Sequence, residues 1–368
     1  MQWIEEGDGV FRGGGVKGIA LAGALCGFAE HPTKPVKRWE NVAGASAGAI
    51  IASYLALGHT AAEMQDLLRN TNYGDFQDFP LGRKFFGGGP NLLLKHGLAP
   101  GDAFEEWFDG ILGGATFEQV EKEPEGDRDC DWRLKLIAVD VTHRDLLVLP
   151  DDLHRYRLPG KSERIEPSGF KIAKAARMSM SLPYFFEPVV LDHVKSGKAA
   201  VIIDGGILSN FPVWIFDVNP REAGRPPRRP TFGFTLVGGR SFGLNANLLA
   251  KLTPWPLEFA FEIFHTAQQA WDKRFVSQST RVRTVEVDAA DVGTTDFDLS
   301  DEREQLLIDN GRRAAREFLD EFELADYMNT FHAKLGEDAA ESSSAALTRE
   351  EQVATGEELA AQGQRDRK

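Results

Sequence analysis

Two hydrophobic patterns alternate along much of the chain. Short apolar runs of strand length lie at 9–11, 41–43, 133–140, 145–149, 199–203 and 231–237. Runs with helical spacing follow the first two of them, at 16–30 and 49–57. Strands that alternate with helices typically form a parallel sheet covered on both faces, so this order predicts an α/β fold. The run at 145–149 is expected to pair with the one before it.

Several segments depart from this alternation. Residues 79–97 and 249–271 are rich in Phe and Leu, and each is a candidate for an apolar groove or a membrane-facing cap. The Pro- and Arg-rich stretch at 220–230 is incompatible with a helix or a central strand. Residues 300–322 predict an amphipathic helix that starts at a serine N-cap. The sequence after Gly336 has little to bury, which predicts a disordered acidic tail.

Charge and cysteine content narrow the functional classes. The 368 residues carry a formal net charge of −14, which disfavours nucleic acid as a partner because such a surface repels phosphates. Cys26 and Cys130 are the two cysteines, and their spacing suggests neither zinc ligands nor a disulfide framework. The first residues lack the pattern of a signal peptide, and no apolar run is long enough to span a membrane. A cytoplasmic protein without metal or cofactor is expected.

The pentapeptide Gly44-Ala45-Ser46-Ala47-Gly48 lies between a predicted strand and a predicted helix. A Gly-x-Ser-x-Gly sequence in that position forms a nucleophile elbow, in which glycine flanks allow a turn sharp enough to present the serine hydroxyl. The dipole of the following helix stabilises negative charge at the reacting centre. Small residues around a serine also occur where a helix simply packs closely on a strand, so the motif needs support from other sites.

Gly13-Gly14-Gly15-Val16-Lys17-Gly18 also follows a predicted strand and opens a helix. The spacing matches the dinucleotide-binding fingerprint, but such a site needs an acidic residue at the end of the second strand. Here the second strand leads into Gly44 instead. The glycines Gly13, Gly14 and Gly15 therefore fit an oxyanion hole better, because backbone amides without a Cβ can approach a developing alkoxide. The alternative is a tight turn that binds no ligand.

A carboxylate stands at the end of the apolar run 199–203, in Asp204-Gly205-Gly206. At the carboxyl end of a buried parallel strand, Asp204 would point into the crevice where α/β proteins bind ligands. The two glycines let the chain turn away without crowding a substrate. Asp-Gly is also a common turn dipeptide, so an ordinary turn is the competing interpretation.

In order and spacing these residues resemble the patatin-like phospholipase family. The resemblance covers about residues 8–217 and rests on four blocks, at 13–18, 44–48, 175–188 and 204–206. Residues 231–319 are less specifically similar to the C-terminal part of bacterial members. The resemblance implies a three-layer α/β/α fold with a mostly parallel central sheet. It also implies a catalytic domain at 8–217, which is followed by a C-terminal part of the same globular unit at 218–335. The acidic tail inferred from composition takes up 336–368.

The same resemblance implies hydrolysis of acyl esters of lipids by a Ser–Asp dyad. Ser46 would be the nucleophile and Asp204 its base, with Gly13, Gly14 and Gly15 lining the oxyanion hole. Lys17 stands where the family usually has arginine, and lysine lacks the planar fork of a guanidinium. The remaining motif residues are Gly18, Gly44, Gly48, Gly205 and Gly206.

Aspartate is a weak base toward a hydroxyl unless it is desolvated or held within hydrogen-bond distance of the serine. Histidine is the more usual base, and only His265 and His332 follow Asp204 in the Ser…Asp…His order. His265 lies in a Phe-rich helical pattern, where a packed or solvent-facing histidine is the better interpretation, and His332 lies near the tail. The sequence therefore favours a Ser46–Asp204 dyad.

The expected reaction is hydrolysis of a lipid ester, either in solution or at a membrane surface. A neutral-lipid lipase or an acyltransferase would use the same acyl-enzyme, so both are alternatives. A nucleotide-binding or interaction module that has lost turnover is the alternative from another class. The intact Ser46, Asp204 and glycine triplet argue against it.

Overall fold

The computed structural model describes residues 3–71, 97–122, 131–217, 228–238, 281–293, 296 and 299–328. Several predicted features lie outside these residues. They are the segment 79–97 except for Gly97, the segment 249–271, the acidic tail, Cys130, His265 and His332. The described residues belong to two compact units.

The larger unit comprises Gln2–Phe216 and Thr231–Phe322, and it contains every helix and strand named below. The other comprises Met1, Asp217–Pro230 and Glu323–Lys368, of which 217, 228–230 and 323–328 are described. Residues from both sides of position 217 therefore build the larger unit.

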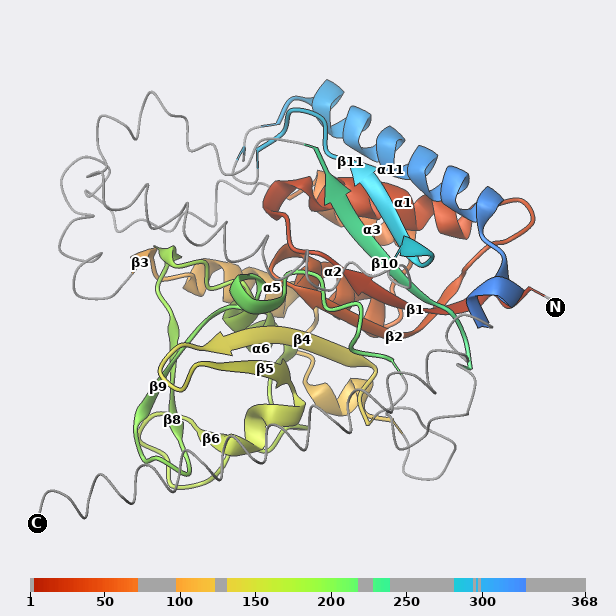
Figure 1. Ribbon diagram of the computed structural model, residues 1–368. Helices are drawn as coiled ribbons and strands as arrows, with labels where there is room; N and C mark the ends of the chain where they lie inside the picture. Colours follow the sequence, from red (N-terminus) through yellow and green to blue (C-terminus); the bar gives the residue numbers. More distant parts are fainter. Residues whose placement is uncertain are drawn as a thin grey trace, which may run out of the picture. The chain divides into compact units, whose positions relative to one another are not determined.

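A nine-stranded sheet in the order β11-β10-β1-β2-β4-β9-β8-β6, with β5 also paired to β4, forms the centre of this unit (Figure 1). Its strands are β1 (Glu6–Phe11), β2 (Arg38–Ala45), β4 (Leu134–Asp140), β5 (Asp145–Leu149), β6 (Tyr156–Arg157), β8 (Val189–His193), β9 (Ala199–Asp204), β10 (Thr231–Val237) and β11 (Thr284–Asp288). A separate two-stranded sheet pairs β3 (Gly97–Ala99) with β7 (Tyr184–Phe186). The strands predicted from apolar runs are all present.

The sheet is parallel in one part and antiparallel in the other. Strands β11, β10, β1, β2 and β4 run parallel to one another, as the alternation predicted. Strand β9 is antiparallel to β4, and β8, β6 and β5 are also held by antiparallel pairing. The expectation that Asp204 ends a parallel strand is therefore wrong. The short connection from β8 to β9 is a hairpin, which makes these two strands antiparallel to each other, and β9 pairs with β4 in the antiparallel direction as well.

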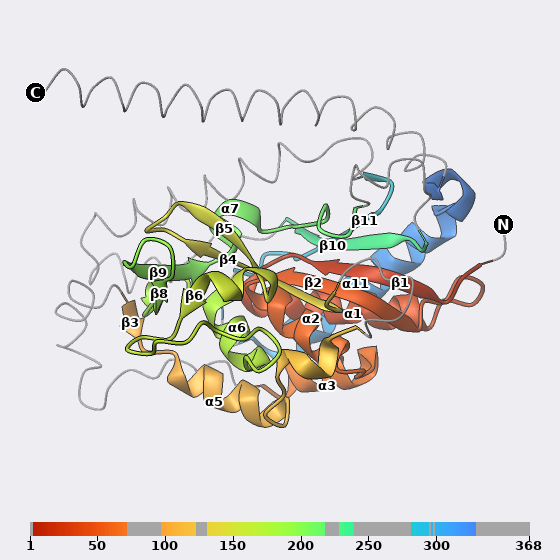
Figure 2. The same cartoon turned by 90° about the horizontal axis from the view of Figure 1, so that it is seen from below.

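Helices cover the sheet, and Figure 2 shows α2, α3, α5 and α6 on one side of it and α7 on the other. The helices are α1 (Gly18–Ala29), α2 (Ala47–Ala56), α3 (Ala61–Arg69), α5 (Asp102–Ile111), α6 (Ile172–Ser179), α7 (Gly206–Ser209) and α11 (Asp301–Glu321), with 3-10 turns η1 (Gly15–Lys17), η3 (Phe117–Val120) and η4 (Asp151–Arg155). Ser300 occupies the N-cap position of α11, which confirms the amphipathic helix predicted at 300–322.

Alternate residues of β1 pack on opposite faces of the sheet. Phe11 stacks on Phe234 with ring centroids 5.1 Å apart, and Phe28 of α1 lies against the same Phe234 at 5.0 Å. On the other face, Val10 packs in a buried cluster with Ala43 and Val213. Both faces of the strand are buried, as the predicted three-layer α/β/α fold requires. Within the described residues, α7 and the chain after it form the second covering layer.

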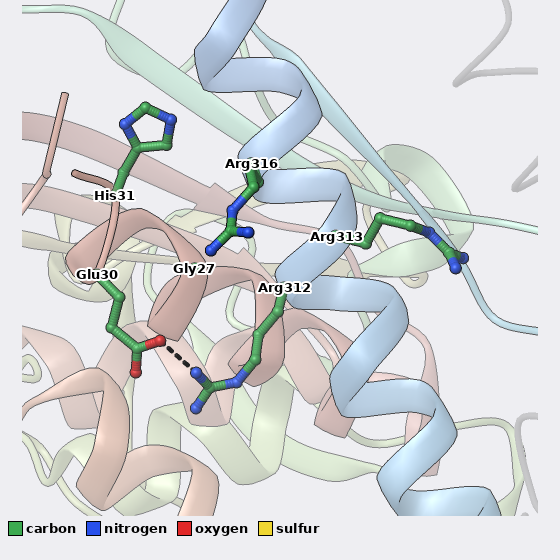
Figure 3. Close-up of a pocket in the computed structure, with 6 residues that line it drawn as sticks. All are labelled: Gly27, Glu30, His31, Arg312, Arg313 and Arg316. Atoms are coloured by element: carbon green, nitrogen blue, oxygen red, sulfur yellow. Dashed lines mark hydrogen bonds and ion pairs between the residues drawn. The ribbon is translucent and has the colours of Figure 1, made fainter. Parts of the chain in front are cut away.

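Helices α1 and α11 approach closely because glycines line their contact. An ideal Cβ on Gly311 would lie 2.1 Å from the Ala20 carbonyl oxygen, so no larger residue fits there. At the end of α1, Arg312 forms an ion pair with Glu30, and both border a cavity of about 270 Å³ (Figure 3). None of the predicted site residues lines this cavity.

Candidate active site

Ser46 occupies the sharp turn between β2 and α2. The strand ends at Ala45, the helix begins at Ala47, and Ser46 has φ 53° and ψ −128°. A positive φ is uncommon for a residue with a side chain, and such strain is concentrated at functional sites. The predicted nucleophile elbow is therefore present in its geometry.

The glycines of the elbow are required by close backbone contacts. An ideal Cβ on Gly44 would lie 2.1 Å from the Gly48 carbonyl oxygen, and one on Gly48 would lie 2.1 Å from the Phe11 carbonyl oxygen. Contacts this short cannot be relieved by a side-chain movement, because backbone atoms are on both sides. The spacing Gly-x-Ser-x-Gly thus reflects the packing of β2, α2 and the end of β1.

Asp204 reaches Ser46 through the register of the antiparallel strand. Asp204 pairs with Ala138 of β4, while Ala45 of β2 pairs with Ile137 of the same strand. The end of β9 and the end of β2 are therefore level across β4. The Asp204 side chain is buried, and it lies close enough to Ser46 for the serine hydroxyl to lower the pKa of its carboxyl.

The protonation of Asp204 is set by its surroundings. Burial raises the pKa of the carboxyl to about 6, and this effect outweighs the opposing hydrogen bonds from the Gly206 amide and the Ser46 hydroxyl. The Gly206 amide donates to Oδ1 at 2.7 Å. A carboxylate with a pKa near neutrality is a stronger base than an ordinary aspartate, and it can also return a proton.

The glycine turn lies directly beside the serine. An ideal Cβ on Gly13 would lie 2.8 Å from Ser46 Cβ, so Gly13 is in contact with the nucleophile. Its amide donates to the Asn210 carbonyl oxygen at 3.2 Å and is already engaged. The amides of Gly14 and Gly15 have no partner among the described residues. Gly15 has φ 58°, and Gly14 has an extended φ of −172°.

Comparison with known families identifies the chain. The profile of the patatin-like phospholipase family matches residues 9–217, which is more than half of the sequence. The chain belongs to the patatin-like phospholipase family. The matched region contains the elbow, the glycine turn and Asp204, so it includes every residue that the sequence predicted for the site.

Two curated relatives extend the comparison. YqhO of Bacillus subtilis is 35% identical over 320 residues, which cover 85% of this chain and 97% of YqhO. R571 of Acanthamoeba polyphaga mimivirus is 26% identical over 211 residues, covering 56% of this chain and 59% of R571. The match to YqhO extends well beyond the family profile, so the likeness includes residues outside 9–217.

Solved structures of similar proteins are more distant. VipD of Legionella pneumophila is 17% identical with a TM-score of 0.46, covering 86% of this chain and 67% of VipD. ExoU of Pseudomonas aeruginosa, in its complex with SpcU, is 16% identical with a TM-score of 0.41, covering 87% of this chain. The chain spans about half the length of ExoU, with 53% covered.

Ser179 connects the two members of the candidate dyad. Its hydroxyl accepts a hydrogen bond from the Ser46 amide at 3.1 Å and donates to the Ile137 carbonyl oxygen at 2.6 Å. Two residues later, the Ser181 carbonyl oxygen accepts from the Asp204 amide at 2.9 Å. The sequence analysis recognised the block 175–188 as typical of the family but assigned no role to it. No local pattern in the sequence indicated the contacts that Ser179 makes.

Arg177 supports this connection from a buried position. Its guanidinium donates to Ser181 Oγ at 2.6 Å, to the Gly101 carbonyl oxygen at 3.1 Å and to the Glu187 carbonyl oxygen at 2.6 Å. A buried charge is tolerated when its donors are satisfied in this way. Arg177 thus holds the chain on both sides of the 179–181 segment.

Lys17, at the end of η1, is buried next to the glycine turn. Burial lowers the pKa of its ammonium, the nearby Arg12 lowers it further, and Asp296 opposes both. Gly18, which follows it, has ordinary contacts only, since an ideal Cβ would lie 3.9 Å from Ala47 Cβ. Gly205 is more restricted, because its Cβ would lie 2.2 Å from the Ile137 carbonyl oxygen.

Two absences concern only the described part of the chain. Its His, Cys, Asp and Glu side chains form no group that could hold a metal ion. Its helices are all too short or too polar to cross a bilayer.

Proposed function

We propose that this chain is a serine acyl hydrolase that cleaves ester bonds of lipids with a Ser46–Asp204 dyad. The observation that carries the proposal is the buried Asp204 carboxyl, whose pKa is influenced by the hydroxyl of a serine on a strained elbow. A serine is a weak nucleophile until an adjacent base activates it. Membership of the patatin-like phospholipase family supports a lipid ester as the substrate.

The proposed reaction begins with attack of Ser46 Oγ on the ester carbonyl carbon while the hydroxyl proton moves to the Asp204 carboxylate. The tetrahedral oxyanion accepts hydrogen bonds from the Gly14 and Gly15 amides, which precede α1 and its positive dipole end. Asp204 then protonates the leaving alcohol. Water hydrolyses the acyl-enzyme with Asp204 again acting as the base.

The raised pKa of Asp204 predicts the pH dependence of this reaction. The base must be ionised, and burial raises the pKa of the carboxyl to about 6. We therefore expect kcat/KM to rise with pH through about 6 and to level off above it. The kcat/KM of a soluble nitrophenyl ester measured against pH tests this. A profile already level at pH 5 would mean that Asp204 is not the base.

A lipid panel tests the function itself. Phospholipids and neutral acylglycerols, offered separately in mixed micelles to the wild type and to Ser46→Ala, should release fatty acid only with the wild type. Ser162→Ala is the matched control, because Ser162 is an exposed serine outside the elbow. Equal release by wild type and Ser46→Ala would exclude Ser46 as the nucleophile. Transfer of the acyl group to an added lipid alcohol would instead indicate an acyltransferase.

A cytoplasmic location and contact with a membrane surface belong to the same proposal, and cell fractionation tests both.

A further inference from the structure

A second serine, histidine and aspartate meet beyond the carboxyl end of β4. The turn at 141–144 joins β4 to β5, and the turn at 194–198 joins β8 to β9. His143 of the first turn lies between Asp140 and Ser196. Its Nδ1 is 2.7 Å from Asp140 Oδ2, and its Nε2 is 2.8 Å from Ser196 Oγ.

The surroundings of Asp140 fix which nitrogen of His143 carries the proton. The Asp140 side chain is fully buried, and Oδ2 also accepts a hydrogen bond from the Tyr156 hydroxyl at 2.9 Å. Its Oδ1 accepts from the amides of Thr142 and His143. An ionised carboxylate only accepts hydrogen bonds, so His143 must donate from Nδ1. In the neutral imidazole, Nε2 then presents its lone pair to Ser196 Oγ.

A second histidine also lies at the serine. His193 Nδ1 is 3.0 Å from Ser196 Oγ and accepts a hydrogen bond from the Ser196 amide at 3.1 Å. Burial lowers the pKa of His193, and the neighbouring His143 lowers it further. Because the Nδ1 lone pair of His193 is engaged by the Ser196 amide, His143 Nε2 is the imidazole acceptor left for the Ser196 hydroxyl proton. Once that proton moves to His143, the resulting cation is paired with the buried Asp140.

We propose that Ser196, His143 and Asp140 form a second nucleophilic site, which takes an acyl group from small soluble esters with a good leaving group. Ser196 is exposed in its turn, so a substrate in solution reaches it without entering the Ser46 site. Its chemistry needs no residue of the proposed dyad. Asp140 orients the imidazole and stabilises its cation, as a carboxylate does in serine hydrolases.

In the proposed step, Ser196 Oγ bonds to the ester carbonyl carbon and the bond to the leaving oxygen breaks. His143 Nε2 takes the hydroxyl proton and passes it to the leaving group, so an acyl-serine and an alcohol are formed. The Gly197 amide is bonded to the His193 carbonyl oxygen, and the Lys198 amide donates to Ser196 Oγ itself. Nearby amides are therefore engaged and offer no oxyanion hole, so the reaction is expected to be slow and to stop at the acylated chain.

Covalent labelling in Ser46→Ala tests the site. An alkyl fluorophosphonate replaces its P–F bond with an O–P bond to an activated serine and releases fluoride and a proton, and it spares lysines. Peptide mapping by mass spectrometry should find the adduct on Ser196 at a rate at least tenfold above that on Ser162, an exposed serine for which no histidine partner is seen in the described chain. Adding His143→Gln should slow the labelling of Ser196 by about 10²-fold, the usual range for loss of a general base.

The same experiment has results that would overturn the proposal. Labelling of Ser196 no faster than of Ser162 would mean that the histidines only hold the two turns together. An unchanged rate in His143→Gln would exclude His143 as the base. The circular dichroism spectrum and cooperative thermal unfolding of the His143→Gln variant should show that it folds, so that a change in labelling reports on the base.

Discussion

Replacing Asp204 with asparagine separates the chemistry of this residue from its packing. The amide has nearly the same shape, and its oxygen can still accept the hydrogen bond from the Gly206 amide. Its nitrogen can donate to Ser46 Oγ, so the contact between the two side chains is kept with reversed direction. Only the ability to take a proton is lost. We therefore expect Asp204→Asn to fold and to lose turnover.

The expected loss is large because the dyad has no other base. Removing one member of a catalytic unit costs about 10⁴-fold or more in kcat. At 1.36 kcal/mol for each tenfold, this corresponds to about 5 kcal/mol of transition-state stabilisation. Hydrolysis of a soluble nitrophenyl ester at pH 8 measures it. Ser46→Ala and the double variant should be about equally inactive, since the two residues act together.

The same substitution should stabilise the protein at high pH. Burial raises the pKa of Asp204 from 3.8 to about 6, so the folded state binds this proton more tightly than the unfolded state. The tighter binding of this proton adds about 3 kcal/mol to the free energy of unfolding. This stabilisation is fully present below pH 4 and is lost as the pH rises through 6. Asparagine carries no charge, but its second amide hydrogen must find a partner, which costs roughly 1 kcal/mol. A net gain of about 2 kcal/mol is expected at pH 8.

Denaturant unfolding at pH 8 and at pH 4 measures this difference. Asp204→Asn should be more stable than wild type at pH 8, and the gain should disappear at pH 4. Two results would refute the reasoning. Retained turnover in the folded variant would mean that Asp204 is not the base, and an equal or lower stability at pH 8 would mean that its carboxylate is not held desolvated.

Three other changes test the supporting structure. Gly14→Ala should lower kcat by about 10²–10³-fold by displacing an oxyanion donor. Its folding should be preserved, because the backbone is extended there and the added Cβ meets only the movable end of Leu236; unchanged kcat would exclude this amide as a donor. Ser179→Ala leaves the Ser46 amide and the Ile137 carbonyl unpaired, so urea unfolding should report a loss of about 1–3 kcal/mol, whereas no loss would mean that water replaces the hydroxyl. Truncation after 335 should leave soluble-ester turnover and Tm nearly unchanged, while truncation at 299 removes α11 and should give insoluble protein; a large loss of turnover in the first would mean that the tail contributes to the site.

The sequence predicted the parts of the site that depend on local geometry. The elbow around Ser46 could be recognised because close backbone contacts allow only glycine at positions 44 and 48, which gives a short pattern visible in the sequence. The glycine turn was predicted for the same reason. The sequence analysis expected Asp204 at the end of a strand next to Ser46. The structure places it there, although the strand that carries it is antiparallel to β4 and was expected to be parallel. Hydrophobic runs reveal that a strand exists, but not which way it runs beside its partner.

Contacts between distant parts of the chain could not be predicted in this way. Ser179 is small and polar, and nothing in its immediate sequence indicates that its hydroxyl bridges the Ser46 amide and the Ile137 carbonyl. The hydrogen bond from the Gly13 amide to the Asn210 carbonyl oxygen could not be predicted either, because it depends on how the chain after α7 packs beside the end of β1. The Asp140–His143–Ser196 contact likewise joins two turns that are far apart in sequence.

The insertion of β10 between β1 and β11 has a consequence for the order of synthesis. Every residue proposed to act in the Ser46 site has been synthesised once the chain reaches position 206. Strand β1 gains its second neighbour only when β10 follows, and α11 covers α1 later still. At about 5–20 residues per second, on the order of ten seconds separate Asp204 from the end of α11. During that time the nascent chain holds a complete set of catalytic side chains on an incomplete sheet. The sheet that supports the Ser46 site is therefore complete only after β10, β11 and α11 have been made.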